Sequence, residues 1–123
     1  MPRDVVIVTP QPLSAAHWRA AATAAARAKR DAPDEDWFSA HADGAVTTIS
    51  SPALGAVLTA APSRRVRVAH DLIRLVPEAR AVAGAAWWTE AWAPWGPGGA
   101  VGVSIARILA ASLGGVIQAA EGG

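Results

Sequence analysis

The sequence of 123 residues contains no cysteine, no tyrosine and a single phenylalanine. The absence of cysteine excludes disulfide bonds, thiol nucleophiles and thiolate metal ligands together. Lysine is scarce as well, since Lys29 is the only lysine among eleven basic residues. With ten acidic residues, the formal net charge is only +1. We therefore expect no general electrostatic attraction to nucleic acid or to a membrane surface.

Long apolar runs are also missing, although 52% of the residues are hydrophobic. No run approaches the roughly 20 residues that a membrane-spanning helix requires. The apolar run at residues 5–8 is too short for a signal peptide, so we expect a cytoplasmic protein. The length predicts one domain, residues 1–123, with a single hydrophobic core.

Strand patterns recur along the chain. Residues 4–9 form a β-branched run that stops at Pro10, which is typical of a central strand. A short extended piece is expected at residues 37–41. Apolar runs and alternation predict further strands at residues 46–49, 53–59, 64–68, 82–93 and 115–118.

Two long helices are predicted between these strands. Ser14 precedes an alanine-rich run and can cap it, so the first helix is expected over residues 15–28. Trp18 should anchor this helix, because alanine buries little area per residue. The apolar stripe over residues 101–112 predicts the second long helix, and residues 70–76 favour a short one.

The order of elements indicates the fold class. With only two long helices, both most simply cover one face of one sheet. The sequence therefore predicts an α+β fold, a two-layer sandwich. We expect a mostly antiparallel sheet of five to six strands with the two long helices on one face.

Four of the six tryptophans fall within residues 85–95. If this segment is a strand, its side chains alternate between the two faces of the sheet. Trp87 then lies on one face, while Trp88, Glu90 and Trp92 share the other. Helices on one side leave the other face uncovered, and exposed aromatics around one carboxylate are typical of a protein-recognition site.

Two structural alternatives remain open for these features. A loop at residues 31–44 that folds over the sheet would make the tryptophans ordinary core residues. The acidic residues Asp34, Glu35 and Asp36 are either a solvated loop or carboxylates that face a basic partner. The predicted partner-binding residues are Trp88, Glu90, Trp92, Asp34, Glu35 and Asp36.

The sequence contains no pattern that predicts catalysis, a cofactor or a metal. The glycine-rich residues 96–102 lack the spacing of a dinucleotide-binding loop, and Pro97 removes an amide that a phosphate loop needs. His17, His41 and His70 are not paired at metal-ligand spacing. We therefore predict no catalytic, cofactor-binding or metal-binding residue.

Residues 4–13, 87–91 and 113–117 resemble segments of small α/β proteins from high-GC actinobacteria. Some proteins of that kind are similar to immunity factors encoded beside polymorphic or type VII secreted toxins. The resemblance implies a functional class and assigns no roles to residues. Together with the tryptophan segment, it favours a non-enzymatic cytoplasmic protein that binds and neutralises a toxin domain.

Two other functions fit the same residues. One is a small-ligand-binding or catalytic α+β domain with a tryptophan-lined pocket near Glu90 and His70. The other is a structural subunit that forms homo-oligomers through its uncovered sheet face. The sequence leaves the oligomeric state open.

Overall fold

The computed structural model describes residues 3–28, 38–43, 46–52, 54–66 and 86–119. These residues contain two helices, α1 (Ala15–Ala28) and α3 (Pro97–Ser112). They also contain seven strands: β1 (Arg3–Thr9), β2 (Ser39–Asp43), β3 (Val46–Ser51), β4 (Gly55–Ala60), β5 (Arg64–Val66), β6 (Ala86–Ala93) and β7 (Val116–Ala119).

The strands form one sheet in the order β2-β3-β4-β6-β1-β7, with β5 paired to β6 outside this path. Every pair of neighbouring strands is antiparallel. One edge of β6 pairs with β1 from Trp87 to Ala93, while β4 and β5 pair with different parts of its other edge. The tryptophan strand is therefore central in the sheet.

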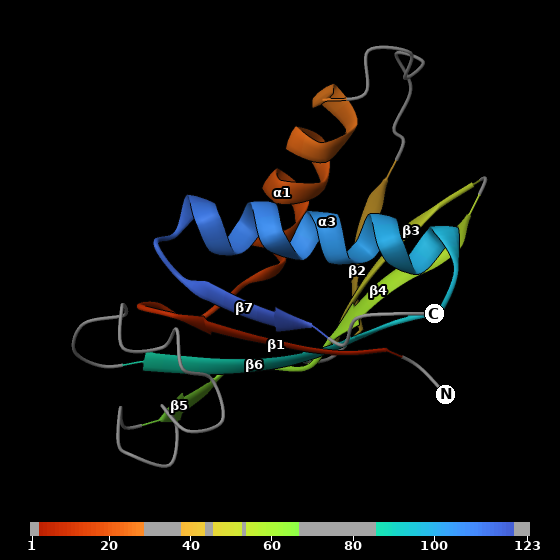
Figure 1. Ribbon diagram of the computed structural model, residues 1–123. Helices are drawn as coiled ribbons and strands as arrows, with labels where there is room; N and C mark the ends of the chain where they lie inside the picture. The colour runs from red at the N-terminus through yellow and green to blue at the C-terminus, as the bar shows by residue number, and fades with distance from the viewer. Residues whose placement is uncertain (1–2, 29–37, 44–45, 53, 67–85, 120–123) are drawn as a thin grey trace.

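Both helices lie on the same side of the sheet (Figure 1). The α3 helix contacts β1, β4, β6 and β7, while α1 contacts α3, β2 and β3. The main core lies between the helices and the sheet, and combines buried residues from both layers. The predicted α+β fold with an antiparallel sheet and two helices on one face is confirmed.

The number of strands differs from the five to six that we expected. The seventh strand is β2, where the sequence predicted only a short extended piece at residues 37–41. Its residues are mostly exposed, so they lack the apolar alternation that marks a strand in a sequence. Pairing with β3, from Ser39 opposite Ser50 to Asp43 opposite Val46, is what makes this segment a strand.

Local capping signals fix the ends of the helices. Ser14 Oγ accepts a hydrogen bond from the His17 amide at 3.4 Å, as expected of an N-cap. At the end of α3, Gly114 has φ 68°. Its amide donates to the Ala111 carbonyl, and the next amide donates to the Ala110 carbonyl, which is the Schellman arrangement. The α1 helix therefore begins, and α3 ends, where the sequence predicts, while α3 begins at Pro97, before the predicted stripe at residues 101–112.

The helix layer packs very close to the sheet. A Cβ atom placed on Gly102 of α3 would lie 1.9 Å from the carbonyl oxygen of Val57 in β4. The helix positions Ala106 and Ala110 and the sheet position Ala91 are also small and buried. The first of the large fully buried side chains by volume is Trp18 of α1, which is 2% exposed and anchors this helix as predicted.

Candidate interaction surface

The central strand β6 carries different side chains on its two faces. Thr89, Ala91 and Ala93 point toward the helices and are almost completely buried. Trp88, Glu90 and Trp92 alternate with them and are each partly exposed. The three residues that the sequence placed on one face therefore do share it, on the side of the sheet away from the helices.

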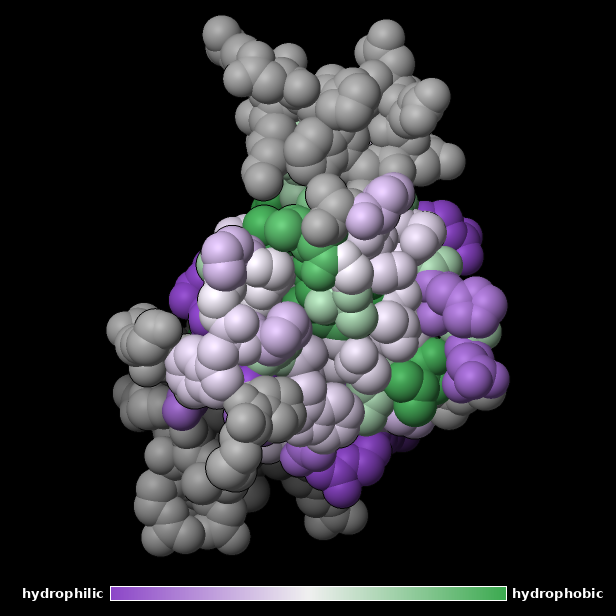
Figure 2. All heavy atoms as spheres, turned by 90° about the vertical axis from the view of Figure 1, so that its right-hand side faces the viewer, coloured by the Kyte–Doolittle hydropathy of each residue, from purple (hydrophilic) through white to green (hydrophobic). Residues whose placement is uncertain are grey.

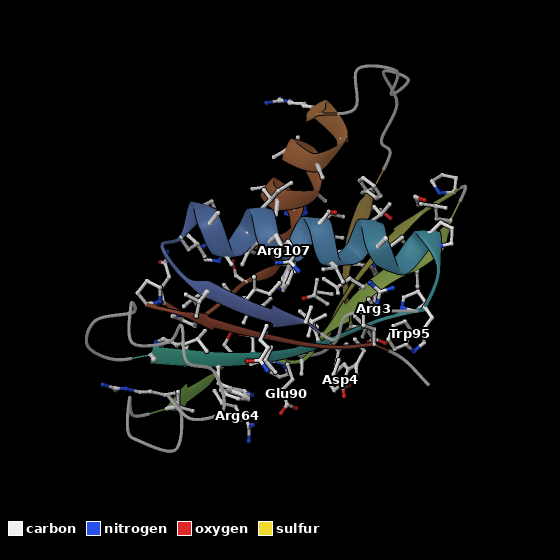
Figure 3. All side chains as sticks on the ribbon, in the orientation of Figure 1. Arg3, Asp4, Arg64, Glu90, Trp95 and Arg107 are labelled. Atoms are coloured by element: carbon white, nitrogen blue, oxygen red, sulfur yellow. The ribbon has the colours of Figure 1, made fainter. Side chains whose placement is uncertain are left out.

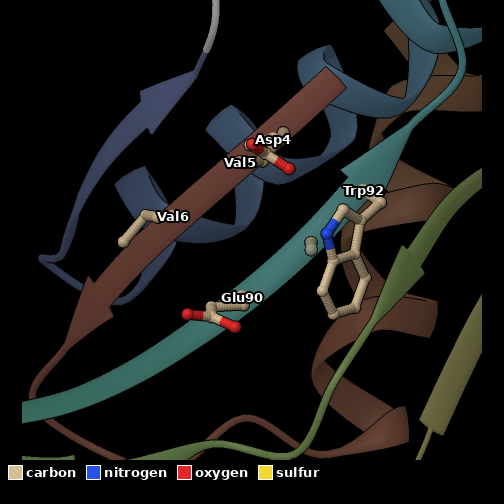
Figure 4. Close-up of a pocket in the computed structure, with 6 residues that line it drawn as sticks. Asp4, Val5, Val6, Glu90 and Trp92 are labelled. Atoms are coloured by element: carbon tan, nitrogen blue, oxygen red, sulfur yellow. The ribbon is translucent and has the colours of Figure 1, made fainter. Parts of the chain in front are cut away.

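The neighbouring strand β1 completes this surface. Its register places Asp4 opposite Trp92, Val6 opposite Glu90 and Val8 opposite Trp88. Figure 4 looks onto these two strands with the helices behind the sheet. We call these six residues the open face: Asp4, Val6, Val8, Trp88, Glu90 and Trp92.

One end of the open face contains a small hydrophobic cluster of its own. Val8 and Ala86 are fully buried there, and Trp88 and Val66 pack against them. Trp88 therefore contributes to packing as well as to the surface. The other end, around Asp4, Glu90 and Trp92, is more accessible.

One oxygen of Glu90 makes polar contacts with both Trp88 and Arg64. The Trp88 indole Nε1 donates a hydrogen bond to Glu90 Oε1 at 3.3 Å. Arg64 Nη2, from β5, forms an ion pair with the same oxygen at 3.6 Å. The Arg64 side chain is 69% exposed and that of Glu90 is 46% exposed, so solvent screens this ion pair. Figure 3 shows Asp4, Glu90 and Arg64 on the side of the sheet away from α3 and its Arg107.

A pocket of about 310 Å³ lies between β1 and β6 at the accessible end of the open face. Its lining consists of Asp4, Val5, Val6, Glu90, Ala91 and Trp92. Two carboxylates and an indole border the same space (Figure 4). Such a lining favours a positively charged group, which carboxylates pair with and which an indole ring attracts through its π face.

Neither a cluster of metal ligands nor a histidine lines the pocket in the described part of the chain. Within the described residues, no group of three histidine, cysteine, aspartate or glutamate side chains is placed to hold a metal ion. His17 binds Ser14 at the start of α1, and His41 is exposed on β2. His70, which the sequence suggested near Glu90, lies outside the described residues.

The other sequence-based candidates fall outside the described residues or in another element. Asp34, Glu35 and Asp36 lie outside the described residues, as does the short helix expected at residues 70–76. The glycine-rich segment serves as the start of α3, with Gly96 as its N-cap and Pro97 in the first turn.

Sequence reasoning missed Asp4 and Arg64, although both border the surface. The alternation within β1 puts Asp4 on the same face as Val6 and Val8. Only the pairing of β1 with β6 brings it opposite Trp92. Arg64 likewise reaches this face only because β5 pairs with β6, which places it opposite Trp88.

Strongly hydrophobic residues do not form one large patch on the side of the molecule in Figure 2. They occur there as small separate areas among neutral and hydrophilic residues. The large hydrophobic side chains that are exposed in the described part of the chain are Val46, Leu54 and Trp95, all outside the open face. On the open face itself, both indoles are partly buried, and Trp88 is hydrogen-bonded to the Glu90 carboxylate.

Neither α1 nor α3 has the length and apolar character that a helix needs to cross a membrane. No protein-family model matches the chain, and no curated protein and no solved structure is found to be similar to it.

Proposed function

We propose that this is a non-enzymatic cytoplasmic binding protein, and specifically an immunity protein that binds and neutralises a toxin domain. The observation that carries the proposal is the grouping of Trp88, Glu90 and Trp92 on the sheet face opposite the helices. Aromatic side chains around a charged group are enriched among the residues that supply most of the energy of protein interfaces.

The rigidity of this surface supports the proposal. The strand β6 is hydrogen-bonded along both edges, and the Trp88 indole is fixed to Glu90 Oε1. Side chains ordered before binding lose less conformational entropy when a partner covers them. The resemblance of residues 4–13, 87–91 and 113–117 to immunity factors supports the particular class of binding protein.

The proposed contact set also includes Asp34, Glu35 and Asp36, on the basis of their charge. Carboxylates at the rim of an interface raise the rate of association with a basic partner and suppress wrong partners. Substitution of Asp36 should therefore slow association more than it speeds dissociation.

Co-expression with a secreted toxin encoded beside the gene, which the proposal expects, tests this function. Wild-type protein should protect cells, and Trp92→Ala should weaken toxin binding about thirtyfold or more, the effect of losing about 2 kcal/mol at a hot spot. Trp95→Ala is the matched control, since this indole is 44% exposed and lies outside the open face. A toxin that still kills, or an affinity that Trp92→Ala and Asp36→Ala both leave unchanged, contradicts the proposal.

The pocket beside Glu90 favours a second candidate, a small-ligand-binding domain. A pocket of about 310 Å³ is at the lower end of the range that holds small organic ligands. A metabolite screen followed by tryptophan fluorescence separates this function from the first, because a ligand site responds when no partner protein is present.

The other function expected from the sequence is a structural subunit that forms homo-oligomers through the open face. Sedimentation of the protein alone tests this self-association.

A further inference from the structure

We propose that the pocket between β1 and β6 receives an arginine side chain of the partner protein. The guanidinium group stacks against Trp92 and pairs with the carboxylates of Asp4 and Glu90. This inference rests on the proposed function and adds the chemistry of the partner's central contact.

The strand register sets the spacing of the three groups. Asp4 is directly opposite Trp92, and Glu90 is the diagonal neighbour of Asp4 across the same antiparallel pair. Directly opposed Cβ atoms lie about 4.5–5.5 Å apart, and diagonal neighbours about 7–8 Å apart. A planar cation can therefore lie between the two carboxylates while one of its faces meets the indole.

The volume of the pocket fits such a side chain. About 310 Å³ corresponds to roughly ten water molecules at about 30 Å³ each. The roughly seven non-hydrogen atoms of an arginine side chain occupy less than the space of these waters, so it can enter once they leave.

The polar groups around the pocket have unused hydrogen-bonding capacity. Glu90 uses only Oε1 for its contacts with Trp88 and Arg64. Within the described residues, Glu90 Oε2 and both carboxylate oxygens of Asp4 have no hydrogen-bond or ion-pair partner. A guanidinium group offers five N–H donors in a fixed plane, which is enough to reach both carboxylates.

The charge balance selects a cation over an anion. Asp4 and Glu90 contribute two negative charges, and Arg64 compensates one of them through an exposed ion pair. The weakness of exposed ion pairs lets Arg64 share Glu90 with a second cation or move aside.

The fold already contains one contact of the same type. Arg3 is the neighbour of Asp4 in the sequence, and its guanidinium carbon lies 4.8 Å from the centroid of the Trp95 ring. Arginine is favoured over lysine for the pocket, because its flat, weakly hydrated group stacks on an indole and binds carboxylates in a fixed geometry.

Titration of the free protein with N-acetylarginine amide tests the pocket without any partner. Binding is followed by the indole N–H signals in NMR, with N-acetyllysine amide and the neutral N-acetylcitrulline amide as comparison probes. We expect the order arginine, lysine, citrulline, with citrulline at least about tenfold weaker than arginine, because it lacks the charge that strengthens the hydrogen bonds. Asp4→Asn should weaken the arginine probe about tenfold, and Asp43→Asn on the exposed strand β2 should not change it.

The same variants are then tested against the toxin domain. We expect Asp4→Asn and Glu90→Gln each to weaken the complex about tenfold or more, and a matching loss when one arginine of the toxin is replaced. When Asp4→Asn is combined with the substitution of that toxin arginine, the two losses of affinity should not add, because both residues act on the same contact.

The outcomes distinguish the two proposals. If the toxin binds the wild-type protein, Asp4→Asn and Glu90→Gln with equal affinity, the pocket proposal is wrong and the immunity function stands. Equal responses to arginine and citrulline, or no response, also overturn the pocket proposal. If the toxin does not bind but the arginine probe does so through Asp4, the immunity function fails and the pocket is a site for free guanidinium compounds.

Discussion

The two faces of β6 show how side-chain volume is distributed in this fold. On the helix side, the strand presents Trp87, which is partly exposed, and then Thr89, Ala91 and Ala93, all at most 1% exposed. On the other side, it presents two indoles and a carboxylate that solvent reaches in part. None of the three tryptophans of the strand belongs to the main core, which contains its small residues Ala91 and Ala93.

The close approach of α3 explains this difference. Gly102 meets the backbone of β4, and Ala106 and Ala110 line the same inner surface of the helix. An indole at Ala91 or Ala93 would have to occupy space that close-packed atoms already fill. The position of Trp88 and Trp92 on the other face follows from helix–sheet distance as well as from polarity, which makes their partial exposure a property of the fold.

The largest effect should come from the one tryptophan that does lie in the main core. Trp18→Ala should lower the free energy of unfolding by about 3–5 kcal/mol, because it removes a fully buried indole from the core and leaves a cavity. Denaturant unfolding measures the loss. Trp95→Ala, at a 44% exposed indole, is the control and should cost far less. Equal losses for the two variants would contradict the assignment of Trp18 as the anchor of α1.

A second prediction tests the helix–sheet distance directly. In Gly102→Ala, the new Cβ would lie 1.9 Å from a backbone carbonyl oxygen, so α3 has to move. We expect a loss of about 1–3 kcal/mol, measured by denaturant unfolding. Gly98→Ala is the matched control on the same helix, because its Cβ would meet no atom closer than 3.7 Å. A Gly102→Ala protein as stable as Gly98→Ala would disprove the close packing.

Much of this fold could be predicted because its signals are local. The β-branched run of β1, the Ser14 cap and the alanine run of α1 each depend on residues near one another in the sequence. The alternation of β6 is local too, which is why Trp88, Glu90 and Trp92 were correctly placed on one face. The strand β2 was not counted, because only its pairing with β3 identifies it.

The rest of the candidate site depends on pairing between distant segments. Asp4 and Trp92 are far apart in sequence and meet only through the register of β1 with β6. Arg64 reaches Glu90 only because β5 pairs with the same strand. Register is set by the packing of whole strands, so no short motif contains it.

A smaller effect should follow from the polar contact that fastens the connection between β4 and β5 to the core. Ser63 Oγ lies 2.7 Å from Thr89 Oγ1, and it accepts a hydrogen bond from the Leu13 amide at 2.9 Å. Ser63→Ala leaves the buried Thr89 hydroxyl without this partner and should cost about 1–2 kcal/mol in unfolding free energy. Ser104→Ala, at an exposed hydroxyl on α3, should be nearly neutral. A neutral Ser63→Ala would show that this contact does not stabilise the helix-facing side of β6.

The smallest effect on stability is expected on the open face itself. Glu90→Gln removes the ion pair with Arg64, which spans 3.6 Å between largely solvated side chains. Exposed ion pairs contribute at most about 1 kcal/mol to stability. The free energy of unfolding at low salt should therefore fall by less than that amount, and the difference should be smaller at high salt. A double-mutant cycle with Arg64→Ala isolates the pair from other effects of each substitution. A loss above about 2 kcal/mol would mean that Glu90 is part of the structural core, and a surface that the fold itself needs in this way is a poor candidate for a partner's binding site.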